Sequence, residues 1–172
     1  MGGAIAYTVW TRNSKILAVP ADDYIFNTTL FARYNPNNNP VSQDICVRTV
    51  PIDKIRPELL AEGKLVESFC AGVWSGWGYA YQRRFLEKKY RGSDTADQLW
   101  DNQELKSSNY EIGQRITDHF EVVSKNANSI IVRCGDSPRK MEVRDSDGLF
   151  EILADIKQDE GVAEFGLKSV SQ

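Results

Sequence analysis

The sequence has few of the residues that build common catalytic and metal sites. Its 172 residues include a single histidine, His119, and three cysteines, Cys46, Cys70 and Cys134. These four residues stand far apart and have no zinc-site spacing, so we predict no bound metal. Phosphate-binding glycine loops, GxSxG and HExxH motifs are absent as well. A catalytic triad would depend on His119 alone, and a lone histidine at the start of a strand is more typical of a structural role.

Long apolar runs and an excess of basic charge are also missing. The longest uncharged stretch, residues 68–82, is too short and too polar to span a bilayer, and no signal peptide is recognisable. The net charge is −3, and the basic residues are scattered apart from Arg83-Arg84 and Lys88-Lys89. We therefore expect a cytoplasmic protein with no nucleic-acid partner and no membrane span. The length favours one domain over residues 1–172, with residues 1–20 as an N-terminal arm.

Aromatic side chains are concentrated in one segment, residues 63–91. This segment holds two Trp, three Tyr and two Phe residues, and we predict that it forms one long helix. Apolar residues recur in it at intervals of four, which indicates one packing face; they are Leu65, Phe69, Val73, Trp77, Tyr81 and Phe85. Such a row drifts around a helix, so the helix either crosses a sheet obliquely or breaks near Gly76 or Gly78. The spacing of Gly72 and Gly76 suits the close approach of another backbone.

The rest of the chain predicts mainly strands. Residues 24–34 are rich in aromatic and β-branched side chains, and residues 44–50 alternate, so both are predicted as strands. Residues 57–62 are predicted as a helical turn, and residues 95–105 as a short helix that carries Leu99 and Trp100. After Gly113 the pattern has period two, and its predicted antiparallel strands are 119–124, 129–134, 139–144, 149–157 and 162–170.

Alternation also assigns faces to the last two of these strands. One face of residues 149–157 carries Phe150, Ile152, Ala154 and Ile156, and one face of residues 162–170 carries Ala163, Phe165 and Leu167. We therefore predict an α+β fold in which an antiparallel strand meander packs on the long aromatic-rich helix. The expected architecture is helix-grip-like, with an internal apolar cavity.

The aromatic segment is also the candidate functional site. Trp74, Trp77, Tyr79 and Tyr81 cannot all face one core, because successive helical residues lie about 100° apart. Either the second helix face contacts another subunit, or the rings line a ligand cavity. Indole N–H and phenol O–H groups are neutral donors that can hold a substrate carbonyl.

Specific roles follow from the cavity interpretation. The predicted substrate-binding residues are Phe69, Cys70, Trp74, Trp77 and Tyr81, and the predicted catalytic donors are Tyr79 and Arg133. Exposed cross-strand ion pairs are an alternative explanation for the charged group formed by Arg133, Glu142, Arg144 and Asp145. Each cysteine has apolar neighbours, which favours a small buried hydrophobic residue.

Three stretches carry a resemblance to a protein family. They are FCAGVWSGWGYAYQRRFLEKKYR (69–91), HFEVVSKNANSIIVRCGDSPRK (119–140) and GLFEILADIKQDEGVAEFGLKSV (148–170). Across about residues 50–170 the chain resembles small fungal proteins encoded in natural-product gene clusters, which are similar to START-like, helix-grip domains. One departure is that helix-grip domains usually close with a long C-terminal helix, whereas this sequence stops just after a predicted strand. The cavity would then be closed by the N-terminal segment or a second subunit, or the helix-grip analogy is wrong.

The resemblance implies an enzyme that works without a cofactor. Its reaction would be a norbornene-forming intramolecular Diels–Alder cycloaddition, or an isomerisation, of an apolar terpenoid intermediate in fungal secondary metabolism. The expected partner is this small apolar substrate, and a homodimer stays open. Two alternatives use the same aromatic helix: a non-catalytic carrier of an apolar metabolite or lipid, and an interaction module with a dimer surface.

Overall fold

A seven-stranded antiparallel sheet with helices on both faces forms the protein, in a computed structural model that describes residues 11–142 and 144–172. The strand order is β1-β2-β7-β6-β5-β4-β3. The strands are β1 (Ser14–Leu17), β2 (Ser42–Pro51), β3 (Arg115–Ile116), β4 (Phe120–Lys125), β5 (Ser129–Gly135), β6 (Asp147–Lys157) and β7 (Val162–Ser171). The helices are α2 (Thr29–Tyr34), α3 (Lys64–Ser75), α4 (Trp77–Tyr90) and α5 (Asn102–Ser107). Short 3₁₀ turns are η1 (Tyr24–Asn27), η2 (Ile52–Lys54), η3 (Pro57–Leu60), η4 (Ser93–Thr95) and η5 (Gln158–Glu160).

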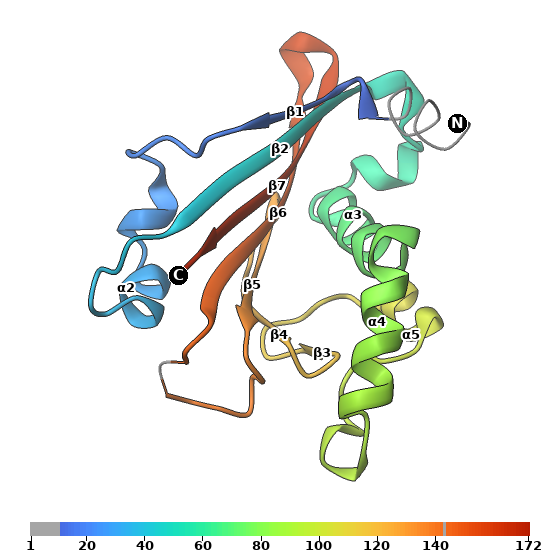
Figure 1. Ribbon diagram of the computed structural model, residues 1–172. Helices are drawn as coiled ribbons and strands as arrows, with labels where there is room; N and C mark the ends of the chain where they lie inside the picture. The colour runs from blue at the N-terminus through green and yellow to red at the C-terminus, as the bar shows by residue number, and fades with distance from the viewer. Residues whose placement is uncertain (1–10, 143) are drawn as a thin grey trace, which may run out of the picture.

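The main core lies between the sheet and the layer formed by α3, α4 and α5 (Figure 1). Ile152 and Ala154 of β6 and Ala163 of β7 are fully or almost fully buried there. Phe150, Ile156, Phe165 and Leu167 pack against this cluster from the same strand faces. The predicted alternation of β6 and β7 is therefore confirmed, and so is the mixed α+β class with an antiparallel sheet.

The opposite face of the sheet is only partly covered, by η1 and α2 (Figure 1). Ile25 and Tyr34 from this cover are buried against Ile131, Leu149 and Val170 of the sheet. Odd-numbered residues of β5 and β6 thus form a second, smaller core. Next to this smaller core, the same sheet face has a pocket between β2 and β6.

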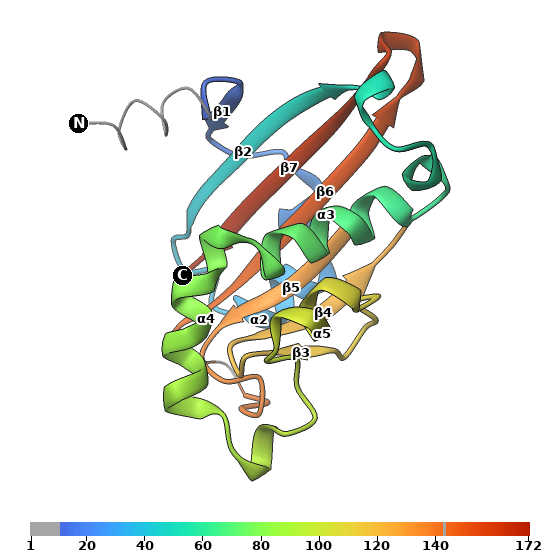
Figure 2. The ribbon, with the colours of Figure 1, turned by 90° about the vertical axis from the view of Figure 1, so that its right-hand side faces the viewer.

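The aromatic segment forms two helices, because the chain breaks at Gly76. Gly76 has an extended conformation (φ −76°, ψ 170°) between the end of α3 and the start of α4, and α4 turns away from α3 (Figure 2). A Cβ atom at Gly76 would lie 2.5 Å from the Gly72 carbonyl oxygen, so this glycine serves the local bend. Nothing lies within 4 Å of a Cβ atom built at Gly72, and among the described residues no backbone from another segment approaches the two glycines.

The break also divides the predicted apolar stripe. Phe69 and Val73 of α3 pack against the main core, but Trp77, Tyr81 and Phe85 of α4 are 93%, 86% and 58% exposed. Tyr79 and Leu86 are the residues that α4 buries. The prediction of one continuous packing face is wrong, because the bend changes which side of the second helix faces the sheet.

Local capping explains two other differences from the predicted elements. Residues 24–34 form η1 and α2 because Asp23 Oδ1 accepts from the Ile25 amide at 3.0 Å and Thr28 Oγ1 accepts from the Phe31 amide at 3.1 Å. The helix predicted at 95–105 begins only at Asn102, where Asp101 and Glu104 form a capping box. Leu99 precedes it in an isolated bridge with Ile116.

Two predicted segments, the strand at 139–144 and the arm at 1–20, include residues that lie outside the described ranges. The described residues of the predicted strand 139–144 form a loop, held by bonds from Arg144 to the carbonyl oxygens of Lys140 (3.2 Å) and Asp136 (2.7 Å). In the predicted arm, residues 1–10 lie outside the described residues, and Ser14–Leu17 forms β1 beside β2. No helix in the described ranges is long and apolar enough to cross a membrane.

Candidate functional site

A groove of about 770 Å³ lies between the bend of the α3–α4 pair and the sheet. The bend contributes Gly72, Val73, Trp74, Gly76, Trp77, Gly78, Tyr79 and Gln82, and the strands contribute Phe120, Cys134, Phe150, Leu167 and Ser169. None of these lining residues carries a charged side chain. Most of the lining is apolar, as is usual for sites that bind small organic molecules.

Trp74 lies at the centre of the aromatic wall. Its ring centroid is 5.0 Å from that of Tyr79, 4.7 Å from that of Phe120 and 6.2 Å from that of Phe150. The Tyr79 and Phe150 rings meet Trp74 nearly edge to face, an arrangement that aromatic pairs prefer. Trp74 is 3% exposed. Its packing on residues from α4, β4 and β6 makes this wall a rigid surface.

The polar groups in the groove are neutral. Gln82, Cys134 and Ser169 line it, and none of the three side chains makes a hydrogen bond to another described residue. Burial raises the pKa of the Cys134 thiol to about 11, with Asp147 adding to the effect, so the thiol stays protonated at neutral pH. A bound carbonyl or hydroxyl group would therefore meet uncharged donors.

Tyr79 lines the groove as well, and its phenol is protonated. Burial raises the pKa of its phenol to about 12, against the smaller opposing effects of Thr117 and Arg83. The phenol oxygen is hydrogen-bonded to Thr117 Oγ1, and either hydroxyl can be the donor. When Thr117 donates, the Tyr79 proton is free for another acceptor. Thr117 and Asp118 have positive φ angles in the tight turn between β3 and β4.

The predicted site residues divide between the groove and other parts of the fold. Trp74, Trp77 and Tyr79 line the groove, with Trp77 as an exposed residue at its edge. Tyr81 is 86% exposed and is not among the lining residues. Phe69 packs edge to face on Phe165 at 5.0 Å and lines a separate hollow of about 290 Å³.

Cys70 belongs to the core and not to the groove lining. It is fully buried, and burial raises the pKa of its thiol to about 12, which the neighbouring Trp74 indole partly opposes. Beyond this weak contact, the buried Trp74 N–H has no hydrogen-bond partner in the described structure. The interpretation of Cys70 as a small buried hydrophobic residue is confirmed by its burial.

Arg133 lies on the other side of the sheet from the groove. Its Nε donates to Asp147 Oδ1 at 2.8 Å, its Nη2 donates to Asp147 Oδ2, and its guanidinium stacks on the Tyr34 ring at 4.1 Å. Arg133 is 4% exposed, so its ion pair with the neighbouring strand is buried and not exposed as the alternative expected. Its partner is a buried aspartate that the sequence reasoning did not select. The structure does not bring Arg133 to the groove.

The sheet residues of the groove were missed as site residues. Phe150 and Leu167 were assigned to the core face of their strands, and Phe120 begins the strand predicted at 119–124. Their faces were predictable from alternation. The bend at Gly76 decides which part of that face α3 leaves uncovered. The angle of the bend cannot be predicted from the spacing of apolar residues in the sequence.

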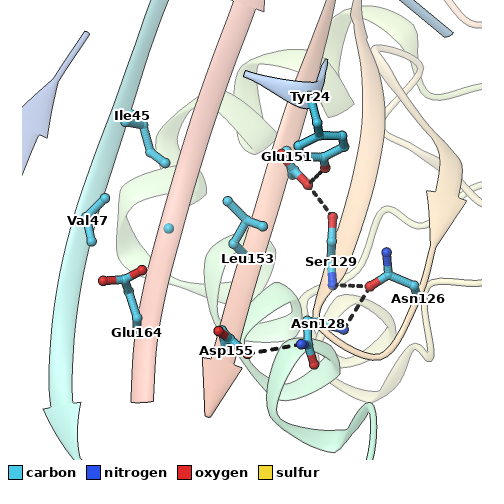
Figure 3. A pocket seen from close by; sticks show the side chains of 11 residues that line it. Tyr24, Ile45, Val47, Asn126, Asn128, Ser129, Glu151, Leu153, Asp155 and Glu164 are labelled. Carbon is cyan, nitrogen blue, oxygen red and sulfur yellow. Dashed lines mark hydrogen bonds between the residues drawn. The ribbon is translucent and has the colours of Figure 1, made fainter. Parts of the chain in front are cut away.

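A second hollow, of about 430 Å³, occupies the opposite sheet face (Figure 3). Its most buried polar group is Glu151, which accepts from the hydroxyls of Tyr24 and Ser129 and lies 2.9 Å from Lys168 Nζ. Burial, reinforced by this bond to Glu151, raises the pKa of the Tyr24 phenol well above its usual range.

The remaining polar groups of the second hollow also have protein partners, including Glu164, which lies 3.1 Å from Lys157 Nζ. Asn126 Oδ1 accepts from the amides of Asn128 (2.9 Å) and Ser129 (2.8 Å), and Asn128 Nδ2 donates to Asp155 Oδ1 at 3.0 Å. These mutual bonds fit a structural role. The apolar groove is therefore the better candidate for a binding site.

Comparisons with known proteins add no relative. No protein-family model, curated protein or solved structure matches the chain significantly. Within the described ranges, no three His, Cys, Asp or Glu side chains gather in a way that could hold a metal ion.

Proposed function

We propose that the protein is a cofactor-independent cyclase or isomerase that folds an apolar terpenoid-type intermediate inside the groove. The observation that carries this proposal is the groove itself: about 770 Å³ of aromatic-walled space with neutral polar groups only. Small-molecule sites typically have volumes of about 300–1,000 Å³, so the size suits a polycyclic substrate. The resemblance to proteins of fungal natural-product clusters, and among them to the norbornene synthase of sordarin biosynthesis, supports the substrate class.

The proposed reaction is an intramolecular [4+2] cycloaddition. Two π bonds of a cyclopentadiene and one π bond of an activated alkene become two new σ bonds and one new π bond. No atom enters or leaves, and no proton or electron is transferred to the protein. Such a reaction needs no acid–base pair, because holding diene and alkene in contact already lowers the barrier.

The aromatic wall would supply this preorganisation. Trp74 is fixed by Tyr79, Phe120 and Phe150, so the wall does not have to rearrange when the substrate binds. A flexible substrate would be confined between this wall and the strand residues Leu167 and Ser169. The loss of substrate freedom occurs on binding and not in the cycloaddition step.

A neutral donor would activate the alkene. A carbonyl conjugated to the alkene gains negative charge in the transition state, and a hydrogen bond then stabilises it more than the ground state. Gln82 and Ser169 are two groove donors that make no hydrogen bond to another described residue, and Tyr79 becomes a third when Thr117 donates to it. These three residues replace Arg133 in the proposed role, because Arg133 faces Asp147 on the other side of the sheet.

The test is the rate of cyclisation of a synthetic substrate in which a cyclopentadiene is tethered to an α,β-unsaturated aldehyde. Product and stereoisomer ratio are measured by chromatography with and without purified protein. We expect faster and more selective cyclisation than in buffer. Binding without any change of rate or selectivity would overturn catalysis and identify the protein as a carrier of apolar metabolites, the alternative that the same groove serves.

Two variants of Ser169 distinguish the effect of the groove's shape from the effect of a hydrogen bond to the substrate. Ser169→Phe puts a ring into the groove from the sheet and should abolish acceleration, whereas Ser169→Ala removes only a donor. Losing one neutral hydrogen bond should slow the reaction by about tenfold or less. Tyr79→Phe tests the second donor in the same way. Tyr81→Ala is the matched aromatic control, since Tyr81 is exposed and outside the groove. Equal rates for Ser169→Phe and the unmodified protein would remove the groove from the mechanism.

A further inference from the structure

The exposed face of α4 combines aromatic and basic side chains. Trp77, Tyr81 and Phe85 are 93%, 86% and 58% exposed. Arg84, Lys88 and Lys89 are exposed as well. At about 100° per residue these six side chains fall within about 140° of the helix circumference. Tyr79 and Leu86 occupy the opposite, buried side. The aromatic and basic side chains therefore share one outward surface, which we call the α4 face.

The cations of the α4 face are not neutralised by the protein. Among the described residues no carboxylate forms an ion pair with Arg84, Lys88 or Lys89, although Lys89 Nζ lies 4.8 Å from the Tyr90 ring centroid. The neighbouring arginines differ: Arg83 lies 3.6 Å and Arg91 2.6 Å from Glu87. The whole chain has a net charge of −3, so the α4 face is a local positive patch on an acidic protein.

We propose that the α4 face binds peripherally to an anionic lipid bilayer surface. Helices that lie in the membrane interface place Trp, Phe and other apolar residues in the headgroup boundary, while Lys and Arg contact anionic lipids. Trp and Tyr suit this boundary because each has an apolar ring and a polar atom. On α4 the rings and cations point to the same side, so both can meet one flat, negatively charged surface.

The positive charge of the α4 face also favours an anionic bilayer over a second copy of the chain as its partner. Two α4 faces packed on each other in a symmetric dimer would bring two sets of three cations together. An anionic surface instead attracts each of them. Trp77 belongs both to the α4 face and to the edge of the groove, so an apolar compound dissolved in the bilayer would enter the groove directly. This last step rests on the proposed function, but lipid binding does not.

The test is cosedimentation of the full chain with vesicles of phosphatidylcholine alone and with 30% phosphatidylserine. We expect binding to the anionic vesicles only, weakened in 0.5 M NaCl because salt screens exposed charges. In a Trp10→Phe background, Trp77 reports contact through a blue shift of its fluorescence, since Trp74 and Trp100 are already buried. In Trp77→Phe the apolar ring remains, so binding should persist while the vesicle-induced shift becomes much smaller.

Charge variants locate the binding surface. Arg84→Glu/Lys88→Glu/Lys89→Glu should weaken partitioning on the order of 100-fold, because each cation near an anionic surface contributes about 1 kcal/mol. The control Lys15→Glu/Lys54→Glu/Lys106→Glu makes the same charge change at three other exposed lysines and should bind far better than the α4 variant. Trp77→Ala should weaken binding by about tenfold, and Ile112→Ala, at a 65% exposed apolar side chain elsewhere, should not.

Three results would overturn the proposal. One is the absence of binding to anionic vesicles, and another is equal binding by the α4 variant and its control. The third is a dimer in light scattering that Trp77→Ala dissociates, without vesicle binding, which would assign the α4 face to a second copy. Because no substrate is present, these results are independent of the cyclisation assay. Circular dichroism of each variant separates lost binding from lost folding.

Discussion

At the scale of single residues, a cluster of buried charged side chains attaches η1 to the sheet face that lies opposite the main core. Lys168 of β7 is 3% exposed and lies 2.9 Å from both Asp23 and Glu151. Its ammonium also lies 4.7 Å from the Tyr24 ring centroid. One lysine thus connects η1 and its preceding residue to the middle of the sheet. A buried charge of this kind is costly to leave without its partner.

Lys168→Met should therefore lower the free energy of unfolding by about 3 kcal/mol, because two carboxylates lose their buried cation. Lys157→Met is the matched control. Lys157 pairs with Glu164 at 3.1 Å, but both side chains are about one-third exposed, so its loss should cost less than 1 kcal/mol. Urea denaturation of both variants measures the difference. Equal losses would contradict the structural importance of the buried cluster.

For the residues of this cluster, the sequence predicts the face of the strand but not the burial of the side chain. Alternation predicts that Glu151 and Lys168 lie on the strand faces opposite to those of Phe150 and Leu167, and this placement away from the main core is confirmed. Their burial was not predicted, because it depends on η1 folding over that face from more than 120 positions away, as the Tyr24–Glu151 bond shows. Alternation identifies the face of a side chain, whereas burial depends on which distant element covers it.

At the scale of elements, the bend at Gly76 decides what the aromatic segment can do. A straight helix would carry this apolar row gradually around its axis, by about 40° at each four-residue step, so Trp77 would lie about 80° from Phe69. The bend instead leaves the three aromatic residues of α4 outside and opens the groove beside Trp74. The sequence left two outcomes open, a helix that crosses the sheet obliquely or a break near Gly76 or Gly78, because a four-residue interval drifts around the helix and glycine weakens it; the structure has the break. Its direction follows from packing on the sheet and was not predictable.

A pair of glycine variants tests the bend. Gly76→Ala should lower the free energy of unfolding by about 2 kcal/mol or more, because the new Cβ would lie 2.5 Å from the Gly72 carbonyl oxygen. Gly72→Ala adds the same methyl group where nothing lies within 4 Å. It should raise stability by up to about 1 kcal/mol, since alanine favours a helix interior over glycine. Denaturant titrations give both values, and a destabilised Gly72→Ala protein would contradict the open space assigned to this position.

At the scale of the whole molecule, two ionic links join the helical layer and the loops to the sheet edge. Glu67 of α3 lies 2.9 Å from Lys125 of β4. Asp118, in the turn before β4, accepts hydrogen bonds from Arg139, Gln98 and Ser137. Burial alone would raise the pKa of each carboxyl group. Hydrogen bonds from Lys64 and Lys125 outweigh it at Glu67, and the three partners named above outweigh it at Asp118, so both pKa values are held below their usual range. Both carboxylates are therefore better stabilised in the folded protein than in the unfolded chain.

Stability should consequently fall in acid. A carboxyl group whose folded pKa is lowered stabilises the protein above its unfolded pKa, and this contribution is lost as the pH falls through the folded value. For Glu67 and Asp118 the loss should begin near their ordinary values of 4.5 and 3.8 and continue below them. Asp118→Asn should be less stable at pH 7 and should lose less stability between pH 5 and pH 3. Asp97→Asn removes an equal charge from an exposed neighbouring position and should keep the unmodified acid profile. Unfolding free energies measured at intervals of half a pH unit would contradict this assignment if both variants showed the same profile as the unmodified protein.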